Sequence, residues 1–215
     1  CDGHDDNCDG TIDEDSAVDT TTWYTDNDND SYGVPTPSVN ACDQPSGYAS
    51  VDTDCDDSNS SANPGATETC DGVDNDCDGT ADSTSVCPCD VEYNGDSTHP
   101  YMFCTNTKSW STARSYCQAY NYELVSVTNN AENVWVDGTA DTFSTDKWWA
   151  GFTDQYSEGS WVWANGETTG YTNWNSNEPN GGTTENCMQM NRFHPTRTWN
   201  DGECWIPKYF ICEID

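Results

Sequence analysis

The clearest periodic pattern in the chain begins at Ser109. Apolar residues recur there at helical intervals of three and four positions: Trp110, Ala113, Cys117 and Tyr120. This spacing predicts an amphipathic helix. A second helix is expected after Asn129 or Asn130, since either side chain can cap it, with Val134 and Trp135 on its apolar side.

After Gly138 the pattern changes from helical spacing to short apolar runs. Four such runs are typical of strands: 148–152, 160–163, 187–191 and 209–213. Between them lies a long stretch rich in Asn and Gly. Two helices followed by short strands and long loops predict an α+β fold for this part of the chain.

The first 85 residues carry few large apolar side chains, chiefly Trp23, Tyr24, Tyr32 and Tyr48. Such a region cannot bury a sizeable core, so disulfides and bound metal would have to stabilise it. The alternative is an acidic disordered linker. Because disordered linkers rarely carry paired cysteines, the sequence favours a small, loop-rich, stapled region.

The charge balance restricts the classes of partner. The 215 residues include 6 Lys plus Arg against 39 Asp plus Glu, a net charge of −33. All six basic residues lie at position 108 or later, and 22 acidic residues precede position 86. Nucleic acid and anionic membrane surfaces are therefore excluded as partners, since both need a basic surface. No apolar run approaches the roughly 20 residues that a membrane helix needs, so no membrane insertion is expected.

Thirteen cysteines indicate an oxidising, extracellular location, either secreted or on the cell surface. Connectivity does not follow from sequence, but three pairs are preferred in the acidic half: Cys1–Cys8, Cys42–Cys55 and Cys70–Cys77. The count is odd, and Cys87 or Cys89 is expected to be the thiol left over. The chain also begins inside a motif, which indicates a processed form or a fragment.

A repeat organises the acidic half. The motif Cys-Asp-Gly, followed at the same distance by Cys-Asp-Gly-Thr, occurs at 1–11 and again at 70–80. We therefore expect three segments: the end of an upstream repeat at 1–15, a complete repeat at 16–85, and a second domain at 86–215.

Between the two copies, Asp26, Asp28 and Asp30 alternate as in the first half of a calcium-binding loop. A helix-loop-helix site would have Gly where Ser31 stands and Glu where Pro37 stands, so that model does not apply. The remaining carboxylates expected to bind metal in the repeat are Asp54, Asp56, Asp57, Asp74, Asp76 and Asp78.

The acidic half also resembles a known repeat. The resemblance is carried by 54–57 (Asp-Cys-Asp-Asp), 63–66 (Asn-Pro-Gly-Ala), Glu68 and 70–79. The repeat that it resembles is the Cys- and Asp-rich metal-binding repeat of bacterial surface proteins. This resemblance implies a stalk or spacer made of tandem repeats.

The second domain resembles a C-type lectin domain. The residues that carry this resemblance occur in the family's order: 110–113 with Cys117, 124–127, 149–152, 161–163, 178–180, 199–201 and 211–213. The resemblance implies a C-type lectin-like fold with two helices, short antiparallel strands and long calcium-binding loops. It also implies the disulfides Cys117–Cys212 and Cys187–Cys204, and Cys89–Cys104 as the additional bridge of the longer form.

The stretch 178–201 concentrates carboxylate and amide oxygens without histidine or a free thiol, a ligand set that suits calcium. The resemblance implies that five residues hold the principal Ca²⁺ and the sugar: Glu178, Asn180, Glu185, Asn200 and Asp201. The order Glu-Pro-Asn implies mannose, fucose, glucose or N-acetylglucosamine, and a cis bond before Pro179. Asp154 and Glu158 match an auxiliary calcium site, with a solvated turn as the equal alternative.

The sequence therefore predicts an extracellular, calcium-dependent carbohydrate-binding module used for adhesion, with glycans as partners. An enzyme is not expected, because the histidines are scattered and lie in no catalytic motif. The alternative is a structural subunit of a surface filament, in which calcium serves contacts with copies of itself or other surface proteins.

Overall fold

The computed structural model of the protein describes residues 10, 12, 20–95, 99–190 and 195–214. The chain divides into two compact units. Unit 1 comprises Cys1–Glu68 with Val73–Thr80, and unit 2 comprises Thr69–Gly72 with Ala81–Asp215. The expected pair Cys1–Cys8 lies outside the described residues.

Unit 1 contains a three-stranded sheet that the sequence did not lead us to expect. Its order is β2-β1-β3, with β1 at Thr21–Thr25, β2 at Val34–Ala41 and β3 at Tyr48–Ala49, all antiparallel. β2 is exposed along most of its length and therefore shows no apolar alternation. It also contains Pro35 and Pro37, which an edge strand tolerates because one side needs no hydrogen bonds.

Unit 2 is built on an eight-stranded sheet whose main path runs β10-β9-β7-β11-β5-β4. The strands are β4 (Asp90–Tyr93), β5 (Pro100–Lys108), β6 (Glu123–Leu124), β7 (Trp148–Thr153), β8 (Val162–Trp163), β9 (Cys187–Met190), β10 (Asn200–Gly202) and β11 (Lys208–Glu213). The pairing is antiparallel except between β7 and β11. The four predicted runs correspond to β7, β8, β9 and β11, whereas β4, β5, β6 and β10 were not expected.

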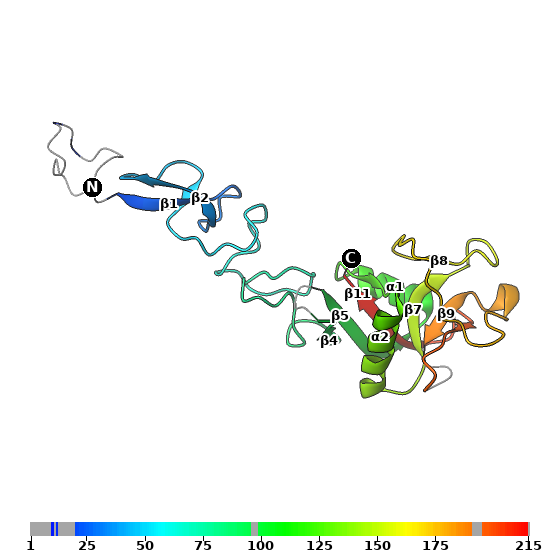
Figure 1. The fold of residues 1–215 in the computed structure, drawn as a ribbon. Coiled ribbons are helices and arrows are strands. Elements are labelled where there is room, and N and C mark those ends of the chain that lie inside the picture. The colour runs from blue at the N-terminus through cyan, green and yellow to red at the C-terminus, as the bar shows by residue number, and fades with distance from the viewer. Residues whose placement is uncertain (1–9, 11, 13–19, 96–98, 191–194, 215) are drawn as a thin grey trace. The chain divides into compact units, whose positions relative to one another are not determined.

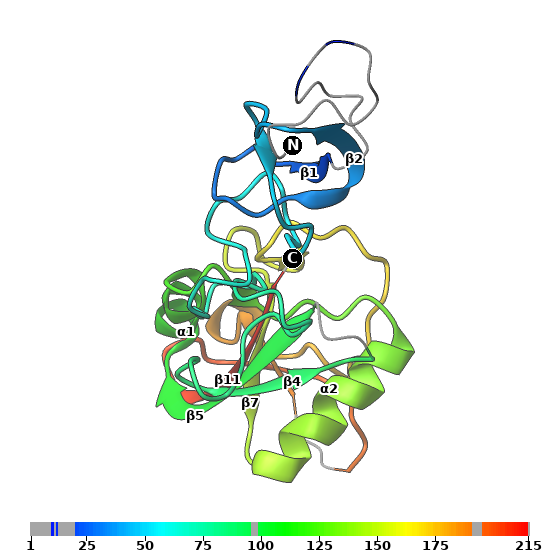
Figure 2. The same cartoon turned by 90° about the vertical axis from the view of Figure 1, so that its left-hand side faces the viewer.

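The two helices cover opposite faces of this sheet (Figures 1 and 2). Side chains alternate along β5, so Met102 and Cys104 pack in one core cluster with Trp110 of α1 (Trp110–Gln118). Phe103 belongs to the second cluster, together with Val136 of α2 (Asn130–Phe143). The α+β prediction is confirmed.

Helix α2 begins as expected, but its buried face agrees with the predicted one only at Trp135, which packs against Tyr101 and Phe103. The Asn129 side chain accepts a hydrogen bond from the Glu132 N–H at 3.0 Å, which confirms the cap. Val134 is 38% exposed. The buried face instead includes Glu132 and Asn133, whose polar groups are paired inside unit 2. Periodicity of apolar residues could not identify a face that is partly polar.

Three predicted disulfides are confirmed, and all lie within unit 2. They are Cys89–Cys104, Cys117–Cys212 and Cys187–Cys204. The first of these, together with Cys70–Cys87, shows that neither Cys87 nor Cys89 is an unpaired thiol, so that expectation was wrong.

The predicted pairs Cys42–Cys55 and Cys70–Cys77 are wrong. Cys55 bonds to Cys77 with a Cα–Cα distance of 5.6 Å, and Cys70 bonds to Cys87 at 5.0 Å. Cys42 is also disulfide-bonded. The intervening chain doubles back, because the Asn63 N–H donates to the Asn75 carbonyl at 2.8 Å. This turn brings residues 22 positions apart to disulfide distance.

Among the described residues, no helix combines the length and apolarity needed to cross a membrane.

Candidate functional site

The candidate site is built on Trp199, which is fully buried and immediately precedes two of the predicted ligands. The Trp199 N–H donates to the Asn173 carbonyl at 2.8 Å, and the Trp199 carbonyl accepts from the Asn175 N–H at 2.9 Å. The Glu178 N–H then donates to the Asn175 carbonyl at 3.0 Å. These bonds hold the long loop that carries Glu178 against the chain that carries Asn200.

The Trp199 ring fixes this arrangement from inside unit 2. Its indole N–H donates to the Asn133 side-chain oxygen of α2 at 2.6 Å. The ring is also surrounded by an aromatic cluster whose other members are Phe152, Trp161, Trp163, Tyr171 and Trp174. Neither Asn133 nor the cluster was singled out from the sequence, although the concentration of tryptophans after position 100 was a signal.

Strand β10 presents Asn200 and Asp201 next to β9. Asp201 opposes Met188 in the antiparallel register, and the bridge Cys187–Cys204 joins the two strands at their ends. Asp201 is 1% exposed, and its Oδ2 accepts from the Gly181 N–H at 2.7 Å. Among the described residues, no donor reaches its buried Oδ1.

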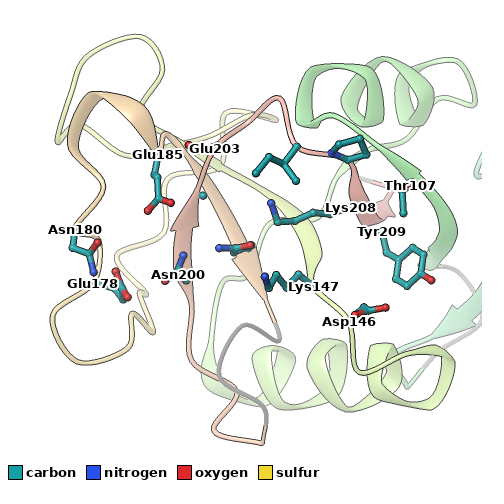
Figure 3. A pocket seen from close by; sticks show the side chains of 14 residues that line it. Thr107, Asp146, Lys147, Glu178, Asn180, Glu185, Asn200, Glu203, Lys208 and Tyr209 are labelled. Carbon is teal, nitrogen blue, oxygen red and sulfur yellow. The ribbon is translucent and has the colours of Figure 1, made fainter.

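Four of the five predicted ligands line one end of a single cavity of about 640 Å³ (Figure 3). They are Glu178, Asn180, Glu185 and Asn200. The Glu178–Pro179 peptide bond is cis, as the resemblance implied. The structure therefore brings four of the predicted residues together, and the carboxylate of the fifth, Asp201, is hydrogen-bonded to the backbone of the same loop.

Gly181 leaves room for Glu185. A methyl group built on Gly181 would overlap the Cβ and Cγ of Glu185, so any side chain here would displace that carboxylate. In the structure this glycine is what allows Glu185 to line the cavity.

The ligand set fits calcium. A buried carboxylate is costly unless it is paired, and the Asp201 Oδ1 has no hydrogen-bond donor among the residues described. Only oxygens are offered by the five residues, and calcium takes six to eight oxygen ligands in flexible geometry. The assignment of these residues as calcium ligands stays a prediction.

The two predicted auxiliary ligands differ in environment. Asp154 is 2% exposed, its Oδ2 accepts from the Gly159 N–H at 2.8 Å, and no described donor reaches its buried Oδ1. Glu158 is exposed. Asp154 is therefore not part of a solvated turn, whereas Glu158 lies on the surface.

Most of the predicted ligands of the acidic half fall into two groups in unit 1. Carboxylate oxygens of Asp26, Asp28 and Asp30 lie within 4.8 Å of one another. The adjacent residue Asp54 is 8% exposed. Burial raises the pKa of the Asp54 carboxyl, and the charges of Asp30, Asp28 and Asp57 raise it further.

The second group combines Asp74 and Asp76 with Glu68, again within 4.8 Å. Glu68 was not predicted as a ligand, although it lies in the segment that carries the resemblance. Asp78 is exposed and its Oδ1 accepts from the Thr80 N–H at 2.9 Å. Asp56 is also exposed, and its Oδ1 accepts from the Ser58 hydroxyl at 2.6 Å. These two carboxylates lie outside both groups.

Comparison with known families agrees with this geometry. The family model described as "Lectin C-type domain" matches residues 106–214, which is half of the chain. The chain belongs to the C-type lectin family. Members of this family bind carbohydrate and are not enzymes, in agreement with the expectation from sequence. A second model, described as "Putative metal-binding motif", matches residues 1–14 and 54–83.

Individual relatives support the assignment to the C-type lectins. Perlucin of Haliotis laevigata is 33% identical over 115 residues, which cover 53% of this chain and 74% of perlucin. The structure of the C-type lectin CEL-I from Cucumaria echinata is 30% identical, with a TM-score of 0.53 over 59% of this chain and 96% of CEL-I. The cow CD23 carbohydrate-recognition domain, solved in the presence of GlcNAc2Man3 oligosaccharide, is 28% identical with a TM-score of 0.51, covering 60% of this chain and 95% of that one.

Proposed function

We propose that this protein is an extracellular, calcium-dependent lectin that binds mannose-type sugars through Glu178, Asn180, Glu185, Asn200 and Asp201. The observation that carries this proposal is the convergence of four of these side chains on one cavity, beside a buried Asp201 oxygen that no described donor reaches. The arrangement suits a cation with open coordination places better than a cation fully enclosed by protein ligands, because the cavity gives a further ligand access to the same side chains.

The chemistry of the site favours a pair of adjacent sugar hydroxyls. A bound calcium would supply coordination places for both hydroxyl oxygens. The Glu178 carboxylate accepts a hydrogen bond from one hydroxyl, and the Asn180 amide donates one to the other. A single shallow contact of this kind gives a millimolar affinity, about 4 kcal/mol. Useful adhesion would then depend on several copies acting together.

The sugar preference follows from the order of the two groups along the loop. An acceptor at 178 and a donor at 180 match hydroxyls arranged as in mannose, fucose or N-acetylglucosamine. The oligosaccharide present with the cow CD23 domain contains mannose and N-acetylglucosamine. That likeness supports the preference proposed for this chain.

The acidic region would serve as a cation-stabilised spacer for the lectin domain at 86–215. The match to a metal-binding motif at 54–83 supports cation binding there, where Glu68, Asp74 and Asp76 lie together. Five disulfides among the described residues support an extracellular location.

Asp154 is the residue best placed to hold an auxiliary ion in unit 2.

The test is retention of the whole chain on immobilised mannose and galactose, in calcium and in chelator. The native chain should bind mannose only in calcium. The double substitution Glu178→Gln with Asn180→Asp should shift retention toward galactose, because it exchanges acceptor and donor without moving the backbone. Glu167→Gln, at an exposed position of the same unit, is the matched control and should behave as the native chain.

Two results would contradict the proposal. One is equal retention in chelator, and the other is unchanged selectivity in the double variant. Loss of all sugar binding, together with calcium-dependent assembly of the chain, would instead favour a structural subunit of a surface filament.

A further inference from the structure

The loop that joins β1 to β2 in unit 1 folds around its own carboxylates. The backbone N–H groups of Asp30 and Ser31 donate to the two oxygens of Asp26 at 3.2 and 3.3 Å. The Tyr32 N–H donates to Asp30 Oδ1 at 2.8 Å. Asn29 and Ser31 adopt positive φ angles of 64° and 82°, which turn successive N–H groups inward. One oxygen of Asp30 is thereby held by the backbone, and the other remains available.

A second segment, at 54–57 and thus 21 or more residues further along the chain, completes this loop. The Asp54 N–H donates to the Gly33 carbonyl at 3.1 Å, which places Asp54 beside the end of the loop. Asp57 accepts from the Asn27 N–H at 2.7 Å and from its side-chain amide at 2.5 Å. The two segments are thus held together by hydrogen bonds that do not use the remaining oxygens of Asp28, Asp30 and Asp54.

Those remaining oxygens are buried and lack a donor. Asp28 Oδ2, Asp30 Oδ2 and Asp54 Oδ2 have no hydrogen-bond partner among the described residues. Asp54 is 92% buried, and its nearest charges are Asp30, Asp28 and Asp57. The chain contains no lysine or arginine before position 108, so unit 1 has none to balance these charges. An ionised carboxylate buried in such surroundings is costly, and a bound cation would offset that cost.

We propose that Asp26, Asp28, Asp30 and Asp54 form a calcium site that joins the β1–β2 loop to the segment at 54–57, with Asp57 holding the loop in place. The carboxylate oxygens of Asp26, Asp28 and Asp30 lie within 4.8 Å of one another. Two oxygens bound to one calcium at 2.3–2.6 Å are at most about 5 Å apart, so this spacing suits a single ion.

The donor chemistry selects a hard cation. All proposed donors are carboxylates. Cys55 and Cys77, which lie beside Asp54, form a disulfide with each other, so neither offers a thiolate to a soft metal. The site also extends beyond the matched metal-binding motif, whose segments at 1–14 and 54–83 include Asp54 but not the loop at 26–32. It is independent of the sugar site, because its residues all belong to unit 1.

The experiment compares hydrogen exchange of the full chain in calcium and in chelator, peptide by peptide, together with a count of bound calcium by native mass spectrometry. When the calcium concentration is 100 times the dissociation constant, amide hydrogen exchange that requires this site to open should slow about 100-fold at 26–33 and 54–57. Asp28→Asn with Asp30→Asn should remove that protection and one bound ion. Asp43→Asn, an exposed position of the same unit, is the matched control and should keep both.

Unchanged exchange of the native chain at 26–33 on adding calcium would overturn the proposal. So would a double variant that keeps the full ion count and the protection. If the double variant loses the Cys55–Cys77 bridge, the single change Asp54→Asn provides the same comparison, because it alters one ligand outside the loop. Protection at 178–201 in every variant would show that the sugar site is still loaded.

Discussion

The hydrogen bond between Trp199 and Asn133 gives the sharpest test of how the site is supported. Trp199 and Trp163 belong to one aromatic cluster, with ring centroids 5.9 Å apart, and are 0% and 3% exposed. The Trp199 indole N–H donates to Asn133 at 2.6 Å. The buried Trp163 indole N–H has no acceptor among the described residues. Replacing each tryptophan by phenylalanine therefore removes similar atoms but only one hydrogen bond.

The magnitudes follow from burial and pairing. Each substitution loses about 2 kcal/mol of apolar burial. Trp199→Phe also leaves the Asn133 oxygen buried without its donor, which costs a further 1–3 kcal/mol or so. Trp163→Phe removes an N–H that is already unsatisfied, so part of its burial loss is recovered. We expect a loss of about 3–5 kcal/mol for Trp199→Phe and of about 2 kcal/mol or less for Trp163→Phe.

The assay is denaturant unfolding of the disulfide-intact chain in chelator, followed by near-UV circular dichroism of the aromatic cluster. Equal slopes of the free energy against denaturant are required for the comparison. Trp199→Phe should also raise the calcium concentration needed for half-maximal retention on mannose, because Asn200 and Asp201 follow it directly. Equal losses of stability in both variants would refute the role assigned to the hydrogen bond.

Two further predictions concern the same unit. Gly181→Ala should displace Glu185 and weaken calcium-dependent sugar binding at least tenfold. Gly170→Ala is the control and should leave sugar binding unchanged, because a methyl group there meets nothing within 4 Å. Equal binding curves for the two variants would contradict the role assigned to Gly181. Replacing the cysteines of Cys117–Cys212, 95 residues apart, should lower the free energy of unfolding by about 5 kcal/mol, against about 3 kcal/mol for Cys187–Cys204, 17 apart. Only the second pair joins β9 to β10, so its removal should reduce calcium affinity more, as a calcium titration of sugar retention would show.

The lectin half was predictable because its motifs combine local signals with strict order along the chain. Helix α1, the Asn129 cap and three of the disulfides of unit 2 agree with the prediction. The longest strand, β5, was not predicted, because it is apolar on both faces over its first half and therefore shows no alternation.

In the acidic half the sequence indicated the chemistry but not the pairing. Cysteines and carboxylates lie close together along the chain there, so several different disulfide pairs and ligand groups are compatible with their spacing. Cys55 reaches Cys77 only because the chain between them turns back on itself. The strands of unit 1 were missed for a related reason, since β2 is mostly exposed and carries no apolar pattern.

By itself, the sequence determined the family and indicated an oxygen-only ligand set, the residues at 178–201 that we propose hold a cation and a sugar. The tertiary structure decided which of these groups meet and what holds them. It gathered carboxylates of unit 1 into two groups. It also placed Asn133 where its side chain accepts a hydrogen bond from Trp199, and Gly181 where a side chain would overlap Glu185. These features depend on contacts between residues far apart in the chain, and the backbone path that creates such contacts is fixed only when the whole unit packs.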